Sequence, residues 1–216
     1  MHSICDAPPV KRFQLVGGAL CLDFCNTLGG KRGATTRENL NSYRDFISWC
    51  EQTGTVQKSE AEALARKAAG SGAEARRVLN RALELREAIY RIFAAVAEDK
   101  TPPAKDLSRL NAELALGLKR LRVSSRKDGF VWEWASEGEA VDQPLGPIAR
   151  SAADLLTSAE LLADVHRCQG DNCGWLFADS SRNHSRRWCD MRDCGNRAKV
   201  RRHRLKERRV KARRTR

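Results

Sequence analysis

The clearest hydrophobic pattern in the chain is a stripe of apolar residues within positions 73–98. These residues recur every three or four positions, at Val78, Ala82, Leu85, Ile89, Phe93 and Val96. Arg and Glu fill much of the opposite face. The period predicts an amphipathic helix whose apolar face lies in a core, and Pro102-Pro103 ends it.

Shorter stripes and end signals predict four more helices. The first begins at position 41 or 42 and runs to 52, and the second spans 59–70. Ser59-x-x-Glu62 resembles a capping box that opens the second helix. Leucines mark the third helix over 107–118, after the proline pair. The fourth starts at Gly146-Pro147 and continues to position 162.

Two further segments show the patterns of β-hairpins. In residues 12–28, apolar and polar residues alternate on both sides of Gly17-Gly18, which supplies a tight turn. Residues 122–124 and 130–135 alternate around the turn Lys127-Asp128-Gly129. We expect the two hairpins to form one small antiparallel sheet covered by the helices. The predicted fold class of this part of the chain is therefore α+β.

Positive charge is concentrated at one end of the chain. The formal net charge is +13, and residues 165–216 carry 17 Lys and Arg against five Asp and Glu. The first 164 residues are therefore almost neutral. A block of like charge repels itself, so a polyanion such as nucleic acid is the expected partner of this segment.

Two pairs of cysteines precede this basic run. Cys168 and Cys173 are separated by four residues, as are Cys189 and Cys194, with 15 residues between the pairs. Four thiolates form the closed tetrahedral shell of a structural zinc site, which leaves no position for a catalytic water. Four buried thiols or two disulfides are the alternatives, and His184 is an alternative ligand. Polar residues around the first pair favour one structural Zn²⁺.

The residues around these cysteines resemble a known family. Arg-Trp-Cys-x4-Cys-Gly-Asn-Arg-x-Lys, at positions 187–199, is similar to the CGNR zinc finger of bacterial transcription regulators. Leu-Val-Gly-Gly-x-Leu-x-Leu-Asp-Phe-x-Asn-Thr, at positions 15–27, resembles the start of the ABATE domain that precedes this finger. The resemblance implies a stress-induced regulator with a ligand-sensing domain, 1–164, and a zinc finger, 165–216.

The finger is expected to resemble a treble clef and to end in a basic helix. Residues 174–177 predict a strand after the first cysteine pair, and a return strand or loop leads to the second pair. A helix then begins near Arg197. The alternative is that the last ten residues form a disordered basic tail. The candidate DNA-binding residues are Asn196, Arg197, Lys199, Arg201, Arg202, Arg204 and Arg208.

A second group of polar and aromatic residues forms a candidate effector site. Asp23, Asn26 and Thr27 cluster near the end of the first predicted hairpin, and Trp132 and Trp134 share one face of the second. Together they could line a pocket. The alternatives are local turn and cap hydrogen bonds for the polar residues, and packing against helices for the tryptophans.

These features favour a zinc-dependent transcription regulator that binds duplex DNA and a small-molecule effector. An RNA-binding or ribosome-associated zinc module is the alternative, although few aromatic residues accompany the basic ones. An enzyme that uses Asp23 and Asn26 lacks a nucleophile–base pair, so we expect no catalytic activity. The chain has neither an export signal nor a membrane span, which predicts a cytoplasmic protein. Homodimer formation would suit a bacterial operator.

Overall fold

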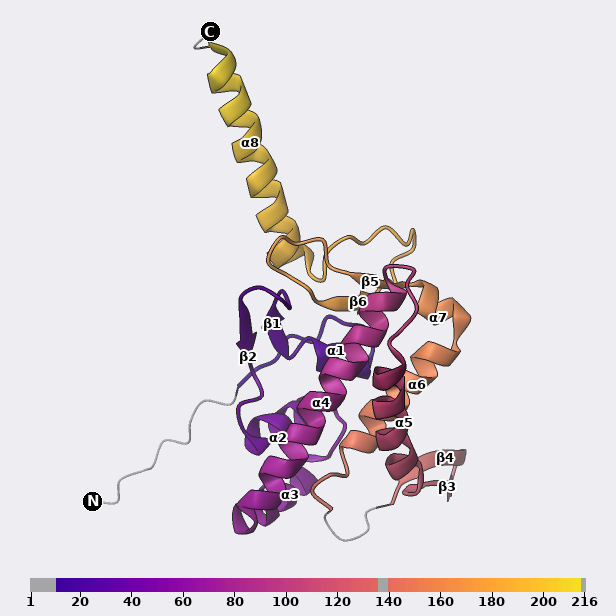
Figure 1. The fold of residues 1–216 in the computed structure, drawn as a ribbon. Coiled ribbons are helices and arrows are strands. Elements are labelled where there is room, and N and C mark those ends of the chain that lie inside the picture. The colour runs from indigo at the N-terminus through magenta and orange to yellow at the C-terminus, as the bar shows by residue number, and fades with distance from the viewer. Residues whose placement is uncertain (1–10, 136–139, 215–216) are drawn as a thin grey trace, which may run out of the picture.

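The long helix α4 (Gly72–Val96) is the central element of the fold (Figure 1). The computed structural model describes residues 11–135 and 140–214. The predicted apolar face of α4 is confirmed, because Val78, Ala82, Leu85, Ile89 and Phe93 are buried. Burial of this face anchors the other helices of the domain, because each of them is amphipathic and needs an apolar surface to cover.

Four helices pack around α4 on two sides. Helices α2 (Tyr43–Gln52) and α3 (Lys58–Gly70) lie on one side. Helices α5 (Ala104–Leu118) and α6 (Leu145–Thr157) lie on the other, followed by the short helix α7 (Ala159–Ala163). All the predicted helices are therefore present. The last one is divided into α6 and α7, where the Ser158 hydroxyl caps the second piece.

The start of α3 differs from the prediction by one residue. Its capping box is formed by Gln57 and Glu60, whose carboxylate accepts a hydrogen bond from the Gln57 backbone N–H at 3.3 Å. Ser59 and Glu62 therefore do not cap this helix. Gln57/Glu60 and Ser59/Glu62 have the same spacing, so the sequence allows either pair to form the capping box. Which pair forms it depends on which face of the helix must reach the core. Ala61, Leu64 and Ala68 occupy that face.

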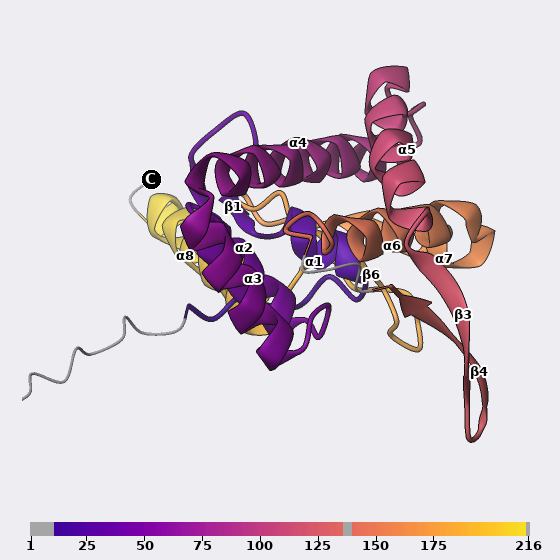
Figure 2. The ribbon, with the colours of Figure 1, turned by 90° about the horizontal axis from the view of Figure 1, so that it is seen from below.

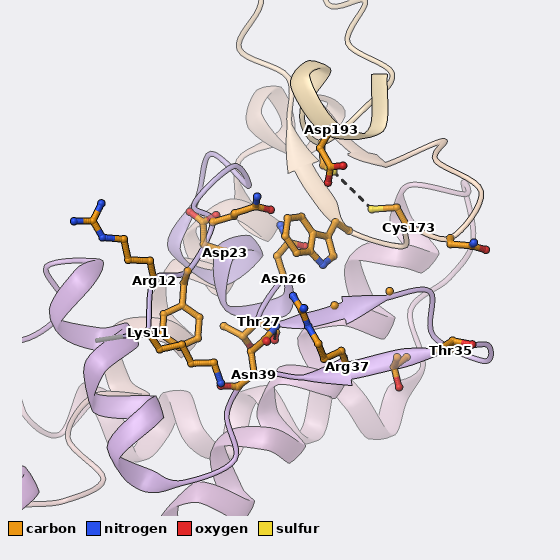
Figure 3. A pocket seen from close by; sticks show the side chains of 18 of the residues that line it. Lys11, Arg12, Asp23, Asn26, Thr27, Thr35, Arg37, Asn39, Cys173 and Asp193 are labelled. Atoms are coloured by element: carbon orange, nitrogen blue, oxygen red, sulfur yellow. Dashed lines mark hydrogen bonds between the residues drawn. The ribbon is translucent and has the colours of Figure 1, made fainter. Parts of the chain in front are cut away.

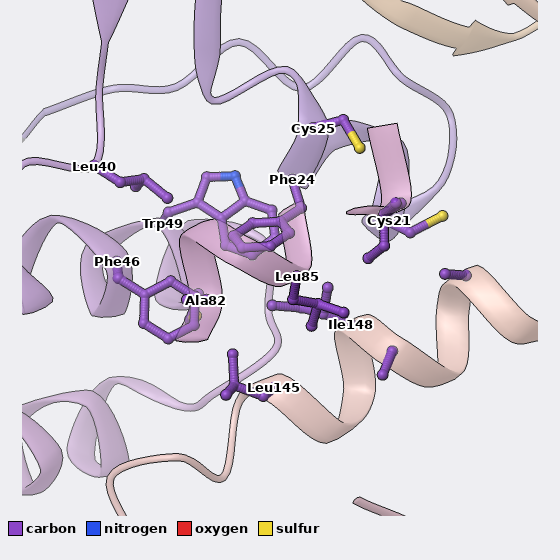
Figure 4. Close-up of a cluster of buried hydrophobic side chains, with 14 of the residues drawn as sticks. Cys21, Phe24, Cys25, Leu40, Phe46, Trp49, Ala82, Leu85, Leu145 and Ile148 are labelled. Carbon is purple, nitrogen blue, oxygen red and sulfur yellow. The ribbon is translucent and has the colours of Figure 1, made fainter. Parts of the chain in front are cut away.

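The first predicted hairpin is wrong, because residues Leu20–Cys25 form a helix, α1. Leu22 and Phe24 are fully buried, as the alternation requires, but Cys21 and Cys25 are fully buried as well. The thiols therefore act as apolar groups rather than as a solvent-facing edge. A segment in which Asp23 is the one polar side chain, and in which Cys21, Leu22, Phe24 and Cys25 are all buried, is suited to a buried helix. α1 lies between α4 and α6, with Phe24 against Trp49 at a ring distance of 5.1 Å (Figure 4).

The strands form small separate hairpins instead of one sheet. Within the described part of the chain, β1 (Leu28–Gly30) pairs with β2 (Thr36–Glu38), and β3 (Leu121–Arg126) pairs with β4 (Gly129–Trp134). The second of these is the predicted hairpin around residue 128. The mixed helix and antiparallel strand class is confirmed, but the single sheet is not. Hairpin β3–β4 projects from the body, beyond α5 and α6 (Figure 2).

A third hairpin joins the C-terminal region to the main core. β5 (Val165–Arg167) pairs with β6 (Leu176–Ala178), and Val165 and Leu176 belong to the same buried cluster as α1 and α4. The C-terminal region is therefore packed on the N-terminal domain through apolar contacts. In the described ranges, none of the helices has both the length and the apolar character required to cross a bilayer.

Helices α5 and α6 cross at two glycines, and this crossing gives a stability prediction. A Cβ atom on Gly117 would lie 2.6 Å from the Cα of Gly146, which is backbone and cannot rotate away. We expect Gly117→Ala to lower the free energy of unfolding by about 1–3 kcal/mol, as overpacked cores do. Gly70→Ala is the matched control, because a Cβ there meets no atom within 4 Å. Urea unfolding of both variants measures the difference, and equal stabilities would contradict the prediction.

Candidate metal centre and nucleic-acid interface

The four late cysteines converge on one point. The Sγ atoms of Cys168, Cys173, Cys189 and Cys194 all lie within 4.8 Å of one another, and all four residues are buried. The Cys173–Cys189 and Cys189–Cys194 sulfur distances are 3.6 and 3.7 Å. A tetrahedron with Zn–S bonds of about 2.3 Å has edges of about 3.8 Å, so the cluster has the size of a Zn²⁺ site. These distances are too long for disulfides.

The charge of the cluster also fits a cation. Hydrogen bonding with Cys168 and the burial of the site raise the pKa of Cys173 to about 12. The pKa of Cys189 is also raised, chiefly by its contacts with the sulfurs of Cys168 and Cys173. Four thiolates at these distances therefore repel one another unless a positive ion neutralises them. Soft sulfur ligands select zinc over magnesium or calcium.

The first cysteine pair lies at the tip of the hairpin β5–β6. The Cys168 N–H donates to the Trp175 carbonyl at 2.8 Å, and the Gly170 N–H donates to Cys168 Sγ at 3.4 Å. The predicted strand at 174–177 corresponds to β6, which pairs with β5, the strand that precedes the first cysteine pair. Of the two expected routes to the second pair, a return strand or a loop, the structure has the loop. Three-residue strands such as β5 are too short to be detected by alternation. An irregular loop leads from β6 to Cys189.

The second pair lies at the start of the terminal helix. A single π-helical turn, Met191–Gly195, contains Cys194 and continues directly into α8 (Asn196–Arg214). The Asp190 side chain caps this turn by accepting a hydrogen bond from the Arg192 N–H at 2.7 Å. Hairpin, loop and helix thus occur in the order of a treble-clef-like module. The predicted helix after residue 195 is confirmed, and it extends through Arg214.

His184 lies outside the metal centre. Its Nδ1 atom is 2.6 Å from Asp164 Oδ1, and more than half of its side chain is exposed. Only the four cysteines therefore provide ligand atoms in this cluster among the residues that the structure describes.

The residues that follow Cys194 connect the metal centre to α8. A Cβ on Gly195 would meet the Met191 sulfur at 2.4 Å, so glycine allows this side chain to fold over the turn. Asn196 Nδ2 donates to the Arg192 carbonyl at 3.0 Å. Arg197 donates to Cys194 Sγ at 3.0 Å and pairs with Asp193 at 3.2 Å. These contacts fix the direction in which the helix leaves the cluster.

The remaining candidate DNA-binding residues divide into two groups. Arg201 forms an ion pair with Asp171, which lies between Cys168 and Cys173, so it also ties α8 to the first cysteine pair. The others are distributed along α8, which extends away from the body (Figure 1). All of these are exposed and form no ion pair within the described ranges: Lys199, Arg202, Arg204 and Arg208.

Comparison with known families accounts for both parts of the chain. Residues 18–159 match the ABATE family, described as a putative stress-induced transcription regulator. The chain belongs to the ABATE family. Residues 165–209 match the CGNR zinc finger, whose four signature residues are Cys194 to Arg197. The cysteine cluster is therefore a structural zinc site. A search of curated proteins finds no match.

An open cavity of about 550 Å³ lies between the ABATE domain and the finger. Three candidate effector residues line it: Asp23, Asn26 and Thr27 (Figure 3). Residues that the sequence analysis did not single out also line it, among them Arg12, Arg37 and Trp175. No local pattern marks these residues, because they meet only through the packing of the finger on the domain.

Asn26 has a structural role in this contact. Its Nδ2 donates to the Leu176 carbonyl at 2.8 Å, and its Oδ1 accepts from the Leu176 N–H at 3.0 Å. Trp175 adds a hydrogen bond from its indole N–H to the Leu28 carbonyl at 2.9 Å. The ABATE domain therefore holds β6 of the finger through paired polar groups, and Asn26 is only 3 % exposed.

The other polar candidates are also hydrogen-bonded within the domain. Asp23 accepts from the Gly17 N–H at 2.7 Å, and burial raises the pKa of its carboxyl group. The Thr27 hydroxyl donates to the Phe24 carbonyl at 2.7 Å and lies 3.2 Å from Arg86 Nη1. These local bonds match the turn-and-cap alternative, and they leave the cavity wall polar.

The structure does not bring the two tryptophans to this cavity. Trp132 is 61 % exposed on hairpin β3–β4, with the Arg150 guanidinium 4.9 Å from its ring centre. Trp134 is half-buried, and its ring lies against Gly146 at the start of α6. Trp134 thus packs on helices, as the second interpretation expected, and neither residue faces the ABATE–finger cavity.

Proposed function

We propose that this protein is a transcription regulator of the cytoplasm that binds duplex DNA through α8. The observation that carries the proposal is the arrangement of charge. The metal centre fixes the first turn of α8, its root, whereas Lys199, Arg202, Arg204 and Arg208 are exposed and have no carboxylate partner among the described residues. The positive charges of such a helix repel one another unless a polyanion neutralises them.

The shape of α8 favours double-stranded DNA. A single helix fits the major groove, which is about 12 Å wide. Arginine side chains can bind guanine edges or phosphates there, whereas lysines bind mainly phosphates. The exposed part of α8 carries Val200 and Leu205 but no Phe, Tyr or Trp side chain on which single-stranded bases would stack. We assign the zinc a structural role and the protein no catalytic one.

The cavity between the ABATE domain and the finger is the proposed effector site. Its wall contains hydrogen-bonding groups from Asp23 and Asn39 of the domain and from Arg197 of α8. A small molecule held there would contact both parts of the protein. This gives effector binding a direct route to the root of the DNA-binding helix. A homodimer completes the proposal, since two linked helices would bind repeated half-sites more tightly than one.

The test of DNA binding removes two free arginines from α8. We expect Arg204→Ala/Arg208→Ala to weaken duplex binding by roughly 10- to 30-fold at 0.15 M salt, if both contact phosphates. The slope of log K against log salt should become shallower by about two. Fluorescence anisotropy with a duplex selected from a random pool measures both quantities.

A matched control separates these contacts from general charge. Arg126→Ala/Lys127→Ala removes the same charge from the tip of hairpin β3–β4, on the far side of the body from α8 (Figure 2). We expect this control to bind the duplex as the unmodified protein does. Equal weakening by both double variants would contradict a specific role for α8. Stronger binding to structured RNA than to every duplex would favour an RNA-binding module instead.

A further inference from the structure

Two arginines outside the finger lie beside the root of α8. Arg12 belongs to the segment that precedes α1, and Arg37 lies on β2. Both residues are exposed and line the rim of the cavity that also contains Arg197. Within the described residues, neither forms an ion pair. Figure 3 shows Arg37 directed from β2 toward the cavity and Arg12 directed outward at its edge.

The cavity and the basic face of α8 form one continuous surface. Arg197 and Asp193 line the cavity, and the same two residues line a groove along α8 with Arg201 and Arg204. Hairpin β1–β2 lies directly beneath the root of the helix (Figure 1). Basic side chains from the ABATE domain therefore extend the surface that begins on α8.

The framework beneath Arg37 is rigid. The neighbouring residue Glu38 receives two hydrogen bonds of 2.7 Å from the buried guanidinium of Arg86 on α4. Arg32, in the turn of the same hairpin, pairs with Glu87 at 2.7 Å. Doubly hydrogen-bonded pairs of a guanidinium and a carboxylate, such as these two partly buried ones, hold a fixed geometry. Arg37 is thus presented from a hairpin that is tied to the central helix.

Arg12 is positioned by its neighbour Lys11. The Lys11 ammonium donates to the Asn39 carbonyl, and it lies 3.9 Å from Asp45 on α2. The Lys11 ammonium is therefore engaged by groups of the domain, whereas the Arg12 guanidinium remains available to bind a phosphate. The two carboxylates that line the cavity are also engaged: Asp193 pairs with Arg197, and Asp23 accepts the Gly17 N–H.

We propose that the ABATE domain contacts DNA directly, with Arg12 and Arg37 holding phosphates of the duplex whose groove α8 enters. This inference rests on the proposed function. Residues 197–208 of α8 span about 16 Å, which is comparable to the groove width. The DNA strand that borders the groove then passes the root of α8, close to Arg12 and Arg37. Phosphate contacts from a rigid body set the register of a recognition helix.

The experiment compares two double variants in the full-length, zinc-loaded protein. Arg12→Ala/Arg37→Ala should reduce duplex affinity by roughly 10- to 30-fold at 0.15 M salt and make the salt slope shallower by about two. The loss should be similar for selected and unrelated duplexes, because phosphates carry no sequence information. Arg12→Lys/Arg37→Lys should retain most of the slope, because it keeps both charges. Thermal melting should be unchanged, since both side chains are exposed.

Three outcomes decide the proposal. An alanine variant with unchanged affinity and slope, alongside a weakened Arg204→Ala/Arg208→Ala variant, would overturn the ABATE-domain contact and leave the proposed function intact. Equal losses in the alanine variant and in Arg126→Ala/Lys127→Ala would also overturn it, because the effect would then be one of net charge. Failure of the unmodified protein to bind any duplex would refute the proposed function and this inference with it.

Discussion

Removal of zinc with a strong chelator is expected to unfold the part of the finger that follows β6 and to abolish duplex binding. Besides the four cysteines, the apolar cluster around the metal centre contains Phe177 as its only fully buried side chain in the described residues. Val16, Trp175 and Trp188 pack against it and are themselves only partly buried. So small a cluster cannot offset the conformational entropy of the segment. Zinc binding, on the order of 10–16 kcal/mol in finger peptides, supplies the missing stability.

The unfolding should be confined to one part of the chain. The core of the ABATE domain, including α1, α2 and α4, makes no use of the metal centre. We therefore expect circular dichroism to show loss of the helicity of α8, and limited proteolysis to cut after about residue 178 and spare the domain. Re-addition of zinc is the control and should restore both signals. A proteolysis pattern that is the same with and without chelator would contradict this result.

Asn26→Leu is expected to have the second-largest effect. The change leaves the N–H and the carbonyl of Leu176 without their buried partners, and each unpaired group costs about 1–3 kcal/mol. We therefore expect a loss of about 2–5 kcal/mol in the free energy that holds β6 to the domain. Hydrogen exchange at residues 165–178 should accelerate more than exchange in α4.

The comparison with a second asparagine separates docking from effector binding. Asn172 lines the same cavity but is exposed, so Asn172→Leu should leave the stability almost unchanged. If Asn26 served only to bind an effector, both variants would be equally stable. An unchanged exchange rate at Leu176 in Asn26→Leu would therefore refute the docking role.

Features that depend on short stretches of sequence could be predicted well. The apolar stripe of α4 recurs over about five turns, so its buried face is evident from spacing alone. The two Cys-x4-Cys pairs likewise carry their own signal, because a tetrahedral metal site needs four ligands from closely spaced pairs. The turn at Asp128-Gly129 identifies hairpin β3–β4 by local chemistry.

Features that arise from packing could not be predicted in the same way. Cys21 and Cys25 look like the second face of a strand, and only the contacts around α1 show that they are part of the core. The pairing of β5 with β6 brings together residues on both sides of the first cysteine pair. The docking role of Asn26 requires Leu176, which lies 150 residues away in the chain. Arg37 and Trp175 reach the cavity only when the finger is in place.

The central claim is that a single zinc ion aims α8 at DNA. The most direct measurement is a titration of zinc into metal-free protein, with α8 helicity and duplex binding recorded on the same samples. Both signals should return together and saturate at about one zinc per chain, as one four-sulfur site requires. Duplex binding of full strength before any zinc is added would contradict it.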